Sequence, residues 1–175
     1  MSNQEKRSFF YPLETISQLT GHAVSWLTVF MVLITFTVVT LRYGFNIGSI
    51  ALQESIGYFH AFIFMIGAAY TLKHDEHVRI DIFYQKMSQQ RQAWVDLLGS
   101  VFLLMPMCIF IFSSSFDYVM KSWAIQEASS EAGGLPLVYL LKTSILIMPL
   151  LVMNQAFVII IQKIQFLRQN EQAHA

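Results

Sequence analysis

Four long apolar segments dominate the hydrophobic pattern of this 175-residue chain. They cover residues of about 20–41, 53–72, 93–120 and 135–161. Each segment reaches the ~20 residues that an α-helix needs to cross ~30 Å of hydrocarbon. Their apolar residues would lie on nearly every side of a helix, whereas the strands of a membrane barrel alternate apolar and polar residues. The pattern therefore predicts an all-α integral membrane protein with four transmembrane helices.

The rest of the chain consists of short loops and two tails. We expect an N-terminal interfacial segment at residues 1–19, a four-helix transmembrane domain at 20–162 and a cytoplasmic tail at 163–175. The first apolar segment is too long for a signal-peptide core and lacks a small-x-small cleavage site, so we expect it to remain in the mature protein. Pro106 and Pro149 interrupt the third and fourth segments and predict a kink one turn before each.

Two stretches outside the spans combine apolar and polar residues. They are SFFYPLETISQL at residues 8–19 and HVRIDIFYQKM at residues 77–87. Such stretches are typical of amphipathic helices that lie along the membrane surface, with basic side chains reaching the headgroups. An ordered connecting loop is the alternative for both.

The composition agrees with a membrane protein and excludes several other classes. Charged residues make up 13% of the chain, about half of the ~25% that is usual in soluble domains. The formal net charge is zero, so there is no basic excess of the kind that binds nucleic acid. The single cysteine, Cys108, excludes an internal disulfide framework and a Cys-rich zinc site.

The basic residues outside the spans predict the orientation. Eight of them lie in the two tails and in the segment between the second and third spans, against two in the other loops: Lys6, Arg7, Lys73, Arg79, Lys86, Arg91, Lys163 and Arg168, against Arg42 and Lys121. The positive-inside rule then places both termini in the cytoplasm. The loop between the third and fourth spans, with Glu127 and Glu131, would face the outer side.

Lys142 is the most informative ionisable residue within the spans. It lies about two turns into the fourth span, at a depth of roughly 10 Å. Its ammonium group can reach the outer headgroups or pair with a carboxylate of compatible depth, for which we expect Glu54, Asp117 or Glu131. We favour a structural ion pair between helices over a transport site.

The positions of the histidines do not suit haem or metal binding. His22 and His60 lie at depths that differ by ~15 Å, which does not suit two ligands of one haem. The sequence HDEH at His74 to His77 lacks the i, i+4 histidine pair of a helical zinc-protease motif. We therefore expect no cofactor, no metal and no catalytic residue.

Several short motifs then follow one another in a characteristic order. They are Arg42–Tyr43, Gln53–Glu54, Gly67–Ala68–Ala69, His77–Val78–Arg79–Ile80–Asp81, and Ser130–Glu131 followed by Gly133–Gly134–Leu135–Pro136 and Lys142. With this order over about residues 20–161, the chain resembles the small membrane (Q-type) subunit of tripartite ATP-independent periplasmic (TRAP) transporters. One departure is that Leu52 and Gln53 stand where a Trp and a second acidic residue often precede the glutamate. This departure weakens the case for a paired acidic site.

The resemblance implies a small scaffold subunit of the bacterial inner membrane, which is not an enzyme. In that family a large membrane subunit carries the substrate and sodium sites and moves as an elevator, and a periplasmic binding protein delivers an organic acid. Expected residues for subunit contact or docking on the outer side are Arg42, Glu54, Glu131 and Lys142. Expected structural or lipid-contacting residues on the inner side are His77, Arg79 and Asp81.

A stand-alone channel or small-molecule exporter that works as a homo-oligomer is the alternative function. Such a protein would need a charged pore or a central carboxylate. No acidic residue lies near the middle of any of the four apolar segments. Purification of the chain, alone or together with a large partner, distinguishes the two functions.

Overall fold

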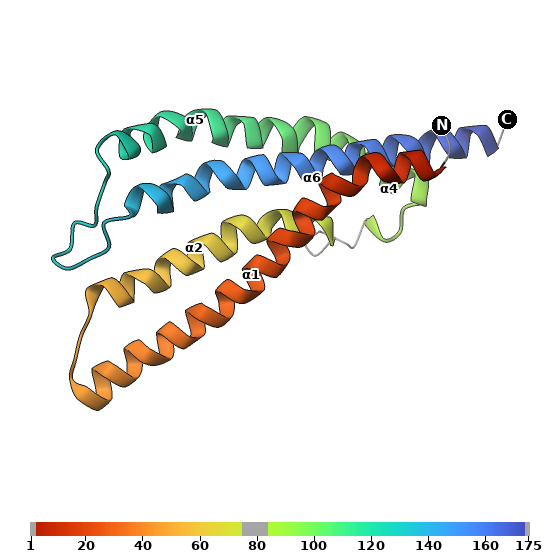
Figure 1. Cartoon of the computed structure of the whole chain (residues 1–175). Helices are drawn as coiled ribbons and strands as arrows, with labels where there is room; N and C mark the ends of the chain where they lie inside the picture. The colour runs from red at the N-terminus through yellow and green to blue at the C-terminus, as the bar shows by residue number, and fades with distance from the viewer. Residues whose placement is uncertain (1–2, 75–83, 174–175) are drawn as a thin grey trace.

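The computed structural model of the chain describes residues 3–74 and 84–173, with side chains at 18–74 and 84–170. The described part of the chain is helical apart from short loops. Its elements are α1 (Asn3–Phe45), α2 (Ile50–Lys73), α4 (Gln89–Gly99), the π-helix η1 (Ser100–Leu104), α5 (Met105–Ala124) and α6 (Val138–Ala173). Since α4, η1 and α5 follow one another without a loop, they form one long helical segment (Figure 1).

Four helical segments are long and apolar enough to cross a membrane, which confirms the predicted fold class. They cover residues 18–45, 50–73, 89–124 and 138–170. The fourth helix begins at Val138, three residues later than the predicted start, because residues 133–136 belong to a loop. Gly133 in this loop has a φ of 81°, a conformation that favours glycine.

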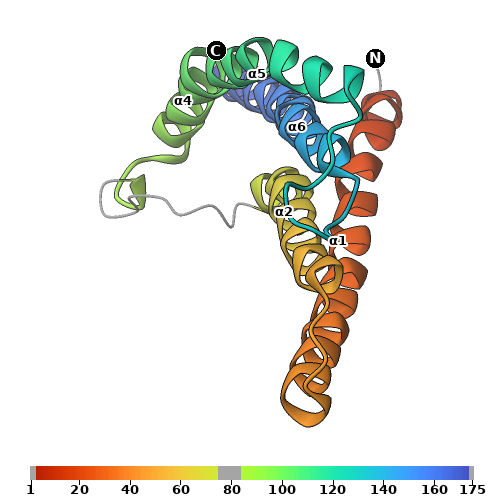
Figure 2. The same cartoon turned by 90° about the vertical axis from the view of Figure 1, so that its left-hand side faces the viewer.

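The helices form a bent row rather than a closed bundle. Viewed along the helices, α5, α6, α2 and α1 follow one another as neighbours (Figure 2). Contacts join α5 to α6, α6 to α2 and α2 to α1, and α6 contacts every other helical element. The last helix is therefore the centre of the fold, and large faces of the other helices are left without a partner from this chain.

One stripe of α1 packs against the rest of the chain. The less exposed positions are spaced by three or four residues: Gly21, Val24, Leu27, Met31, Ile34, Val38 and Leu41. Such spacing keeps one side of a helix against a neighbouring helix. The opposite side is exposed and carries large apolar residues such as Trp26, Phe30 and Phe36.

The second helix shows the reverse pattern. Between residues 51 and 73 of α2, the exposed positions are Gln53, Gly57, His60 and Phe64. Their spacing of four, three and four residues places them on one narrow side. Since α1 and α6 both pack on α2, the other sides of this helix are at least partly buried.

Small buried residues mark where the helices approach one another. Ala69, Cys108 and Val152 form one cluster, where α2, α5 and α6 meet. Ala93, Leu97 and Leu167 form a second cluster between α4 and α6. Small residues at such contacts let helix backbones come close in a membrane.

The helices differ near the two prolines at which a kink was predicted. Before Pro106 lies the π-helix Ser100–Leu104. A proline has no N–H group and its ring clashes with the carbonyl four residues earlier, so the helix widens locally and Met105 N–H donates to the Ser100 carbonyl. Pro149 lies fully buried inside α6, which remains one helix from Val138 to Ala173. The kink predicted at Pro149 remains a prediction.

Both ends of the chain continue the helices of the membrane domain. α1 begins at Asn3, so the predicted N-terminal segment forms one helix with the first span. α6 likewise runs through most of the predicted tail. The first and last described residues lie at the same end of the molecule (Figure 1). The predicted interfacial helix at 77–87 lies mostly outside the described residues.

Candidate functional site

Charged side chains gather at the two ends of the helices. We call the end that carries residues 46–49 and 125–137 the loop end, and the opposite end, with the N- and C-termini, the terminal end. The loop end contains Glu54 and Lys142, two of the residues that the sequence singled out.

Glu54 fastens the long loop to the start of α2. The Ser49 hydroxyl caps α2 by accepting the Leu52 N–H at 3.4 Å, which places Glu54 in the second turn. The Glu54 carboxylate accepts a hydrogen bond from the Ser129 hydroxyl through one oxygen. Its other oxygen accepts the Leu135 N–H at 2.7 Å. Residues far apart in sequence are thus joined by one carboxylate.

The loop is shaped to meet this carboxylate. Ser129 N–H donates to the Leu135 carbonyl at 3.0 Å, and Gly134 N–H donates to the Glu131 carbonyl at 3.0 Å. A Cβ at Gly134 would lie only 2.8 Å from Glu54 Oε1. Glycine therefore permits the close approach of the loop backbone to the acid.

Lys142 forms an ion pair with the same loop. Its Nζ lies 2.5 Å from Glu127 Oε2 and 4.1 Å from the centre of the Tyr118 ring. The aromatic ring adds a cation–π contact to the ion pair. Lys142 on α6 is thus held by the loop and by α5 together.

The predicted partners of Lys142 were wrong. We expected Glu54, Asp117 or Glu131, whereas the structure pairs the lysine with Glu127. Val138 N–H donates to the Glu127 carbonyl at 3.1 Å, so the beginning of the loop folds back over the first turn of α6. In an extended loop Glu127 would lie far from Lys142. Because the backbone folds back, the Glu127 carboxylate comes within reach of the lysine.

The positive charge of Lys142 is neutralised by the negative charge of Glu127. The Lys142 ammonium donates to Glu127 and lowers the pKa of the Glu127 carboxyl below its ordinary value. Glu127 is therefore ionised at neutral pH and stays paired. The pair is partly exposed, with side-chain exposures of 14% for Lys142 and 31% for Glu127, so water screens it and its role is mainly to fix geometry.

Aromatic residues join α5 to α6 at the same end. The Trp123 indole N–H donates to the Thr143 hydroxyl at 2.8 Å. The Trp123 ring also meets the Tyr139 ring edge-on, with 4.7 Å between centroids. Amphipathic aromatic residues are enriched where a span leaves the membrane, which agrees with the predicted position of Trp123 near a span end.

The terminal end contains an ion pair that the sequence did not indicate. Lys163 Nζ lies 2.6 Å from Asp96 Oδ2, and the Tyr84 hydroxyl donates to the same oxygen at 2.7 Å. Gln92 in turn donates to the Tyr84 carbonyl at 2.9 Å. We had assigned Lys163 to a tail, but α6 continues as a helix past this residue. The sequence feature that would have indicated this pair is an acid and a base at the same membrane depth, Asp96 and Lys163.

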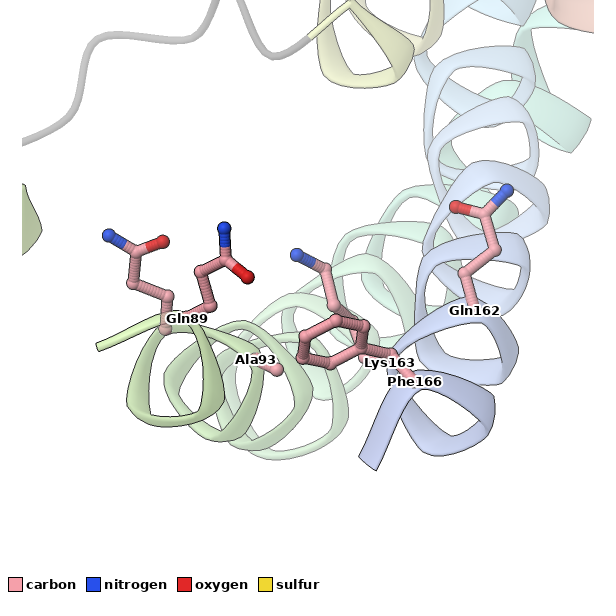
Figure 3. Close-up of a pocket in the computed structure, with 6 residues that line it drawn as sticks. Gln89, Ala93, Gln162, Lys163 and Phe166 are labelled. Carbon is pink, nitrogen blue, oxygen red and sulfur yellow. The ribbon is translucent and has the colours of Figure 1, made fainter. Parts of the chain in front are cut away.

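Two cavities lie near the terminal end. The first, of about 360 Å³, is lined by Gln89, Gln92, Ala93, Gln162, Lys163 and Phe166, between α4 and α6 (Figure 3). The second, of about 350 Å³, lies between α1 and α2 and is lined by Gln18, Gly21, His22, Ser25, Tyr70 and His74. In Figure 3 the side chains of Gln89 and Lys163 extend toward the same open side.

The remaining predicted residues do not join these clusters. Arg42 is exposed in the last turn of α1, and the side chain of Glu131 is exposed in the loop. His77, Arg79 and Asp81 lie outside the described residues. Within residues 3–74 and 84–173, no group of three or more His, Cys, Asp or Glu side chains is arranged to hold a metal ion.

Comparison with known families finds a match over most of the chain. Residues 31–166 match the DctQ component of the tripartite ATP-independent periplasmic transporters. No curated protein matches the chain. The matched region covers most of the chain and includes Glu54, Lys142 and both ion pairs. The family consists of transporter components and is not a family of enzymes. The chain therefore belongs to the DctQ family, the small subunits of TRAP transporters.

Proposed function

We propose that this protein is a scaffold in a sodium-coupled, binding-protein-dependent transporter of an organic acid in a bacterial inner membrane. It supports a large membrane subunit, which carries the substrate and the coupling ions. The observation that carries this proposal is the family match together with the distribution of charge along the four spans.

The middle of each span lacks the charged side chains that would hold an anionic cargo and its coupling ions. Residues 20–41, 55–72, 97–116 and 143–162 contain no Asp, Glu, Lys or Arg. A carrier needs polar or charged groups, or broken helices, near the middle of the membrane to bind its substrate and ions. The π-helix η1, a break in helical regularity, lies among exposed apolar residues such as Phe102 and Leu103.

Charges at the helix ends support a structural role instead. Glu127 pairs with Lys142, and Asp96 pairs with Lys163. Both pairs lie within this chain and tie helices or loops together, so they stabilise the framework and do not remain open to a solute. A rigid support of this kind suits a subunit that stays still while its partner moves.

The loop end is the proposed outer side, where the periplasmic binding protein docks. The loop is held by Glu54 and Lys142, and it exposes Glu131. Arg42 is exposed at the same end. We assign Glu54 and Lys142 to positioning the loop, and Arg42 and Glu131 to contact with the other subunits.

The terminal end is the proposed cytoplasmic side. This orientation follows from the excess of basic residues in both tails and in the connection between the second and third spans. His77, Arg79 and Asp81 belong to that connection. We assign them to contact with anionic lipid headgroups or to local structure.

Reconstitution tests the proposal. The chain is purified with a tag from cells that express all three transporter components, and it is reconstituted into liposomes alone or as the complex. Uptake of a labelled organic acid is then measured with the binding protein added, under a gradient of Na⁺ or of K⁺. We expect uptake by the complex under the Na⁺ gradient, and no uptake by the chain alone.

Two results would contradict the proposal. Transport by the chain alone would favour the stand-alone channel or exporter. Equal uptake by the large subunit with and without this chain would show that the chain is not a required scaffold.

A further inference from the structure

The exposed side of α2 differs in chemistry from the other exposed helix faces. We call Gln53, Gly57, His60 and Phe64 the α2 stripe. Two of these four residues have hydrogen-bonding side chains and one has no side chain. Gln53 lies near the helix end, where water and headgroups can satisfy it, so His60 is the polar residue of the stripe that most needs a partner.

His60 lies near the centre of the membrane. It follows Ile50, the first residue of α2, by ten residues, which corresponds to a depth of about 15 Å at ~1.5 Å per residue. The hydrocarbon layer is ~30 Å thick. The imidazole is exposed and lies beside the Phe64 ring, at 5.9 Å between centroids. Among the side chains that the structure describes, none accepts from or donates to this ring.

An imidazole at this depth needs a polar partner. Facing lipid, its N–H group and its unprotonated nitrogen would both lack hydrogen bonds, which is costly in an apolar medium. Ionisable residues in membrane spans therefore face other protein or a water-filled cavity. His60 therefore points to a contact of the α2 stripe with a second protein.

The exposed face of α1 has no such requirement. Its threonines Thr28, Thr35, Thr37 and Thr40 each donate to the carbonyl four residues earlier, at 2.8 to 2.9 Å. Large apolar side chains cover much of the remaining exposed surface, as at Trp26 and Phe36. These four hydroxyls are satisfied by their own helix, so the face suits contact with lipid.

Gly57 gives a neighbouring helix room beside His60. No heavy atom lies within 4 Å of a Cβ built at this position. It lies one turn from His60 on the same side of α2. A residue without a side chain lets a second backbone come close, and a polar residue one turn away then supplies an interhelical hydrogen bond.

We propose that the α2 stripe receives a transmembrane helix of the large membrane subunit, with His60 hydrogen-bonded to a polar group of that helix, while the exposed face of α1 meets lipid. The proposal rests on the proposed function and adds to it which face meets the partner. Because α1 and α6 flank α2, about one residue per turn is exposed, which gives room for one helix. In a symmetric dimer the α2 stripes of two copies would have to meet. The helices α1 and α6 that flank each stripe would obstruct this contact.

Site-specific crosslinking tests the contact in the assembled complex. The photoreactive residue p-benzoylphenylalanine replaces position 60, or position 36 on the exposed face of α1 as a control of similar depth. We expect position 60 to crosslink to the large subunit, and position 36 to give no protein adduct. A crosslink between two copies of this chain, or no protein adduct at position 60, would overturn the proposal.

Substitution of His60 tests the hydrogen bond itself. His60→Leu should weaken retention of the large subunit roughly 3- to 15-fold, the range expected for one interhelical hydrogen bond. His60→Gln should restore part of the retention, and Thr35→Leu, on the exposed face of α1, should have no effect. Leucine suits an exposed position in the membrane, so folding is preserved, which circular dichroism checks. Equal retention by His60→Leu and Thr35→Leu would contradict the proposal.

The result for the unmodified complex separates this inference from the proposed function. If the large subunit co-purifies with the native chain but position 60 does not reach it, the α2 stripe is not the interface and the scaffold role stands. If the large subunit does not co-purify with the native chain at all, both fail.

Discussion

Glu54 and Lys142 act on the same loop in different ways. Glu54 accepts hydrogen bonds from Ser129 and Leu135, which belong to the later part of the loop. Lys142 pairs with Glu127 at its beginning. The two residues therefore hold both halves of the segment that we propose faces the binding protein.

Replacement of Glu54 by glutamine should loosen this loop. An amide has one acceptor oxygen instead of two, and its NH₂ group would face a donor. We expect faster amide hydrogen exchange at Ser129 and Leu135 in Glu54→Gln, measured by mass spectrometry on the loop peptides. Glu131→Gln is the matched control, because its side chain is exposed, and it should exchange like the native protein. Unchanged exchange in Glu54→Gln would show that the carboxylate does not hold the loop.

Lys142→Met should remove a pH-dependent part of the loop's stability. Lys142 lowers the pKa of Glu127 from its ordinary value of 4.5. The pair therefore stabilises the folded loop above about pH 4.5, and this contribution is lost as the pH falls through the lowered pKa. We expect protection factors of the loop amides to fall on acidification in the native protein, and to be lower at neutral pH and less dependent on pH in Lys142→Met.

Lys121→Met provides the control for this experiment, since Lys121 is an exposed lysine at the same end. It should behave like the native protein. A Lys142→Met variant with the same pH dependence as the native protein would assign the acid response to other groups.

At the scale of the helices, α1 packs tightly against a side chain of α2 at Gly21. A Cβ at this position would overlap the ring of Tyr70. Gly21 is buried and belongs to the packed stripe of α1. Because α1 has few other contacts with the chain, its attachment depends strongly on this stripe.

Gly21→Ala should therefore destabilise the contact between α1 and α2. Overpacking typically costs about 1–3 kcal/mol, and the better helix propensity of alanine offsets up to about 1 kcal/mol of this. We expect a net loss of roughly 1–2 kcal/mol in the free energy of unfolding, measured by circular dichroism in detergent.

Gly67→Ala is the matched control on the same pair of helices. There the nearest atom to a Cβ would be Val24 Cγ1 at 3.7 Å, an ordinary contact. We expect this variant to be as stable as the native protein or slightly more stable. Equal effects of the two substitutions would mean that Tyr70 moves aside without loss of packing.

At the scale of the whole molecule, four spans place the described ends of the chain at one end and the long loop at the other (Figure 1). The distribution of basic residues is the basis for our proposal that the terminal end faces the cytoplasm. The two ends also carry separate ion pairs, Glu127 with Lys142 and Asp96 with Lys163. The orientation is therefore a property of the whole chain that single-cysteine labelling can test.

Cys108 is buried and is the only cysteine, so Cys108→Ala provides a background without thiols. In spheroplasts, a membrane-impermeant maleimide should label Ser130→Cys at the loop end. Gln169→Cys at the terminal end should react only after the membrane is permeabilised. The opposite pattern would invert the proposed topology.

The sequence alone determined the four spans and the fold class. The reason is that a backbone in hydrocarbon must satisfy its own hydrogen bonds, so long apolar segments have to be helices wherever they pack. It also predicted a kink before Pro106, where the structure has a π-helix, because the loss of an N–H group is a local property. Glu54 and Lys142 could be singled out because charges inside apolar segments are rare and costly.

Only the tertiary structure decided which groups meet. The pairing of Lys142 with Glu127 depends on how the loop backbone folds back over α6, and the pairing of Asp96 with Lys163 depends on how α4 packs on α6. The order of the helices in the row likewise determines that the exposed positions of α2 between residues 51 and 73 lie along the stripe with His60. Apolar segments that are hydrophobic on nearly every side contain little information about which side meets a neighbour, because lipid and protein are similarly apolar surroundings.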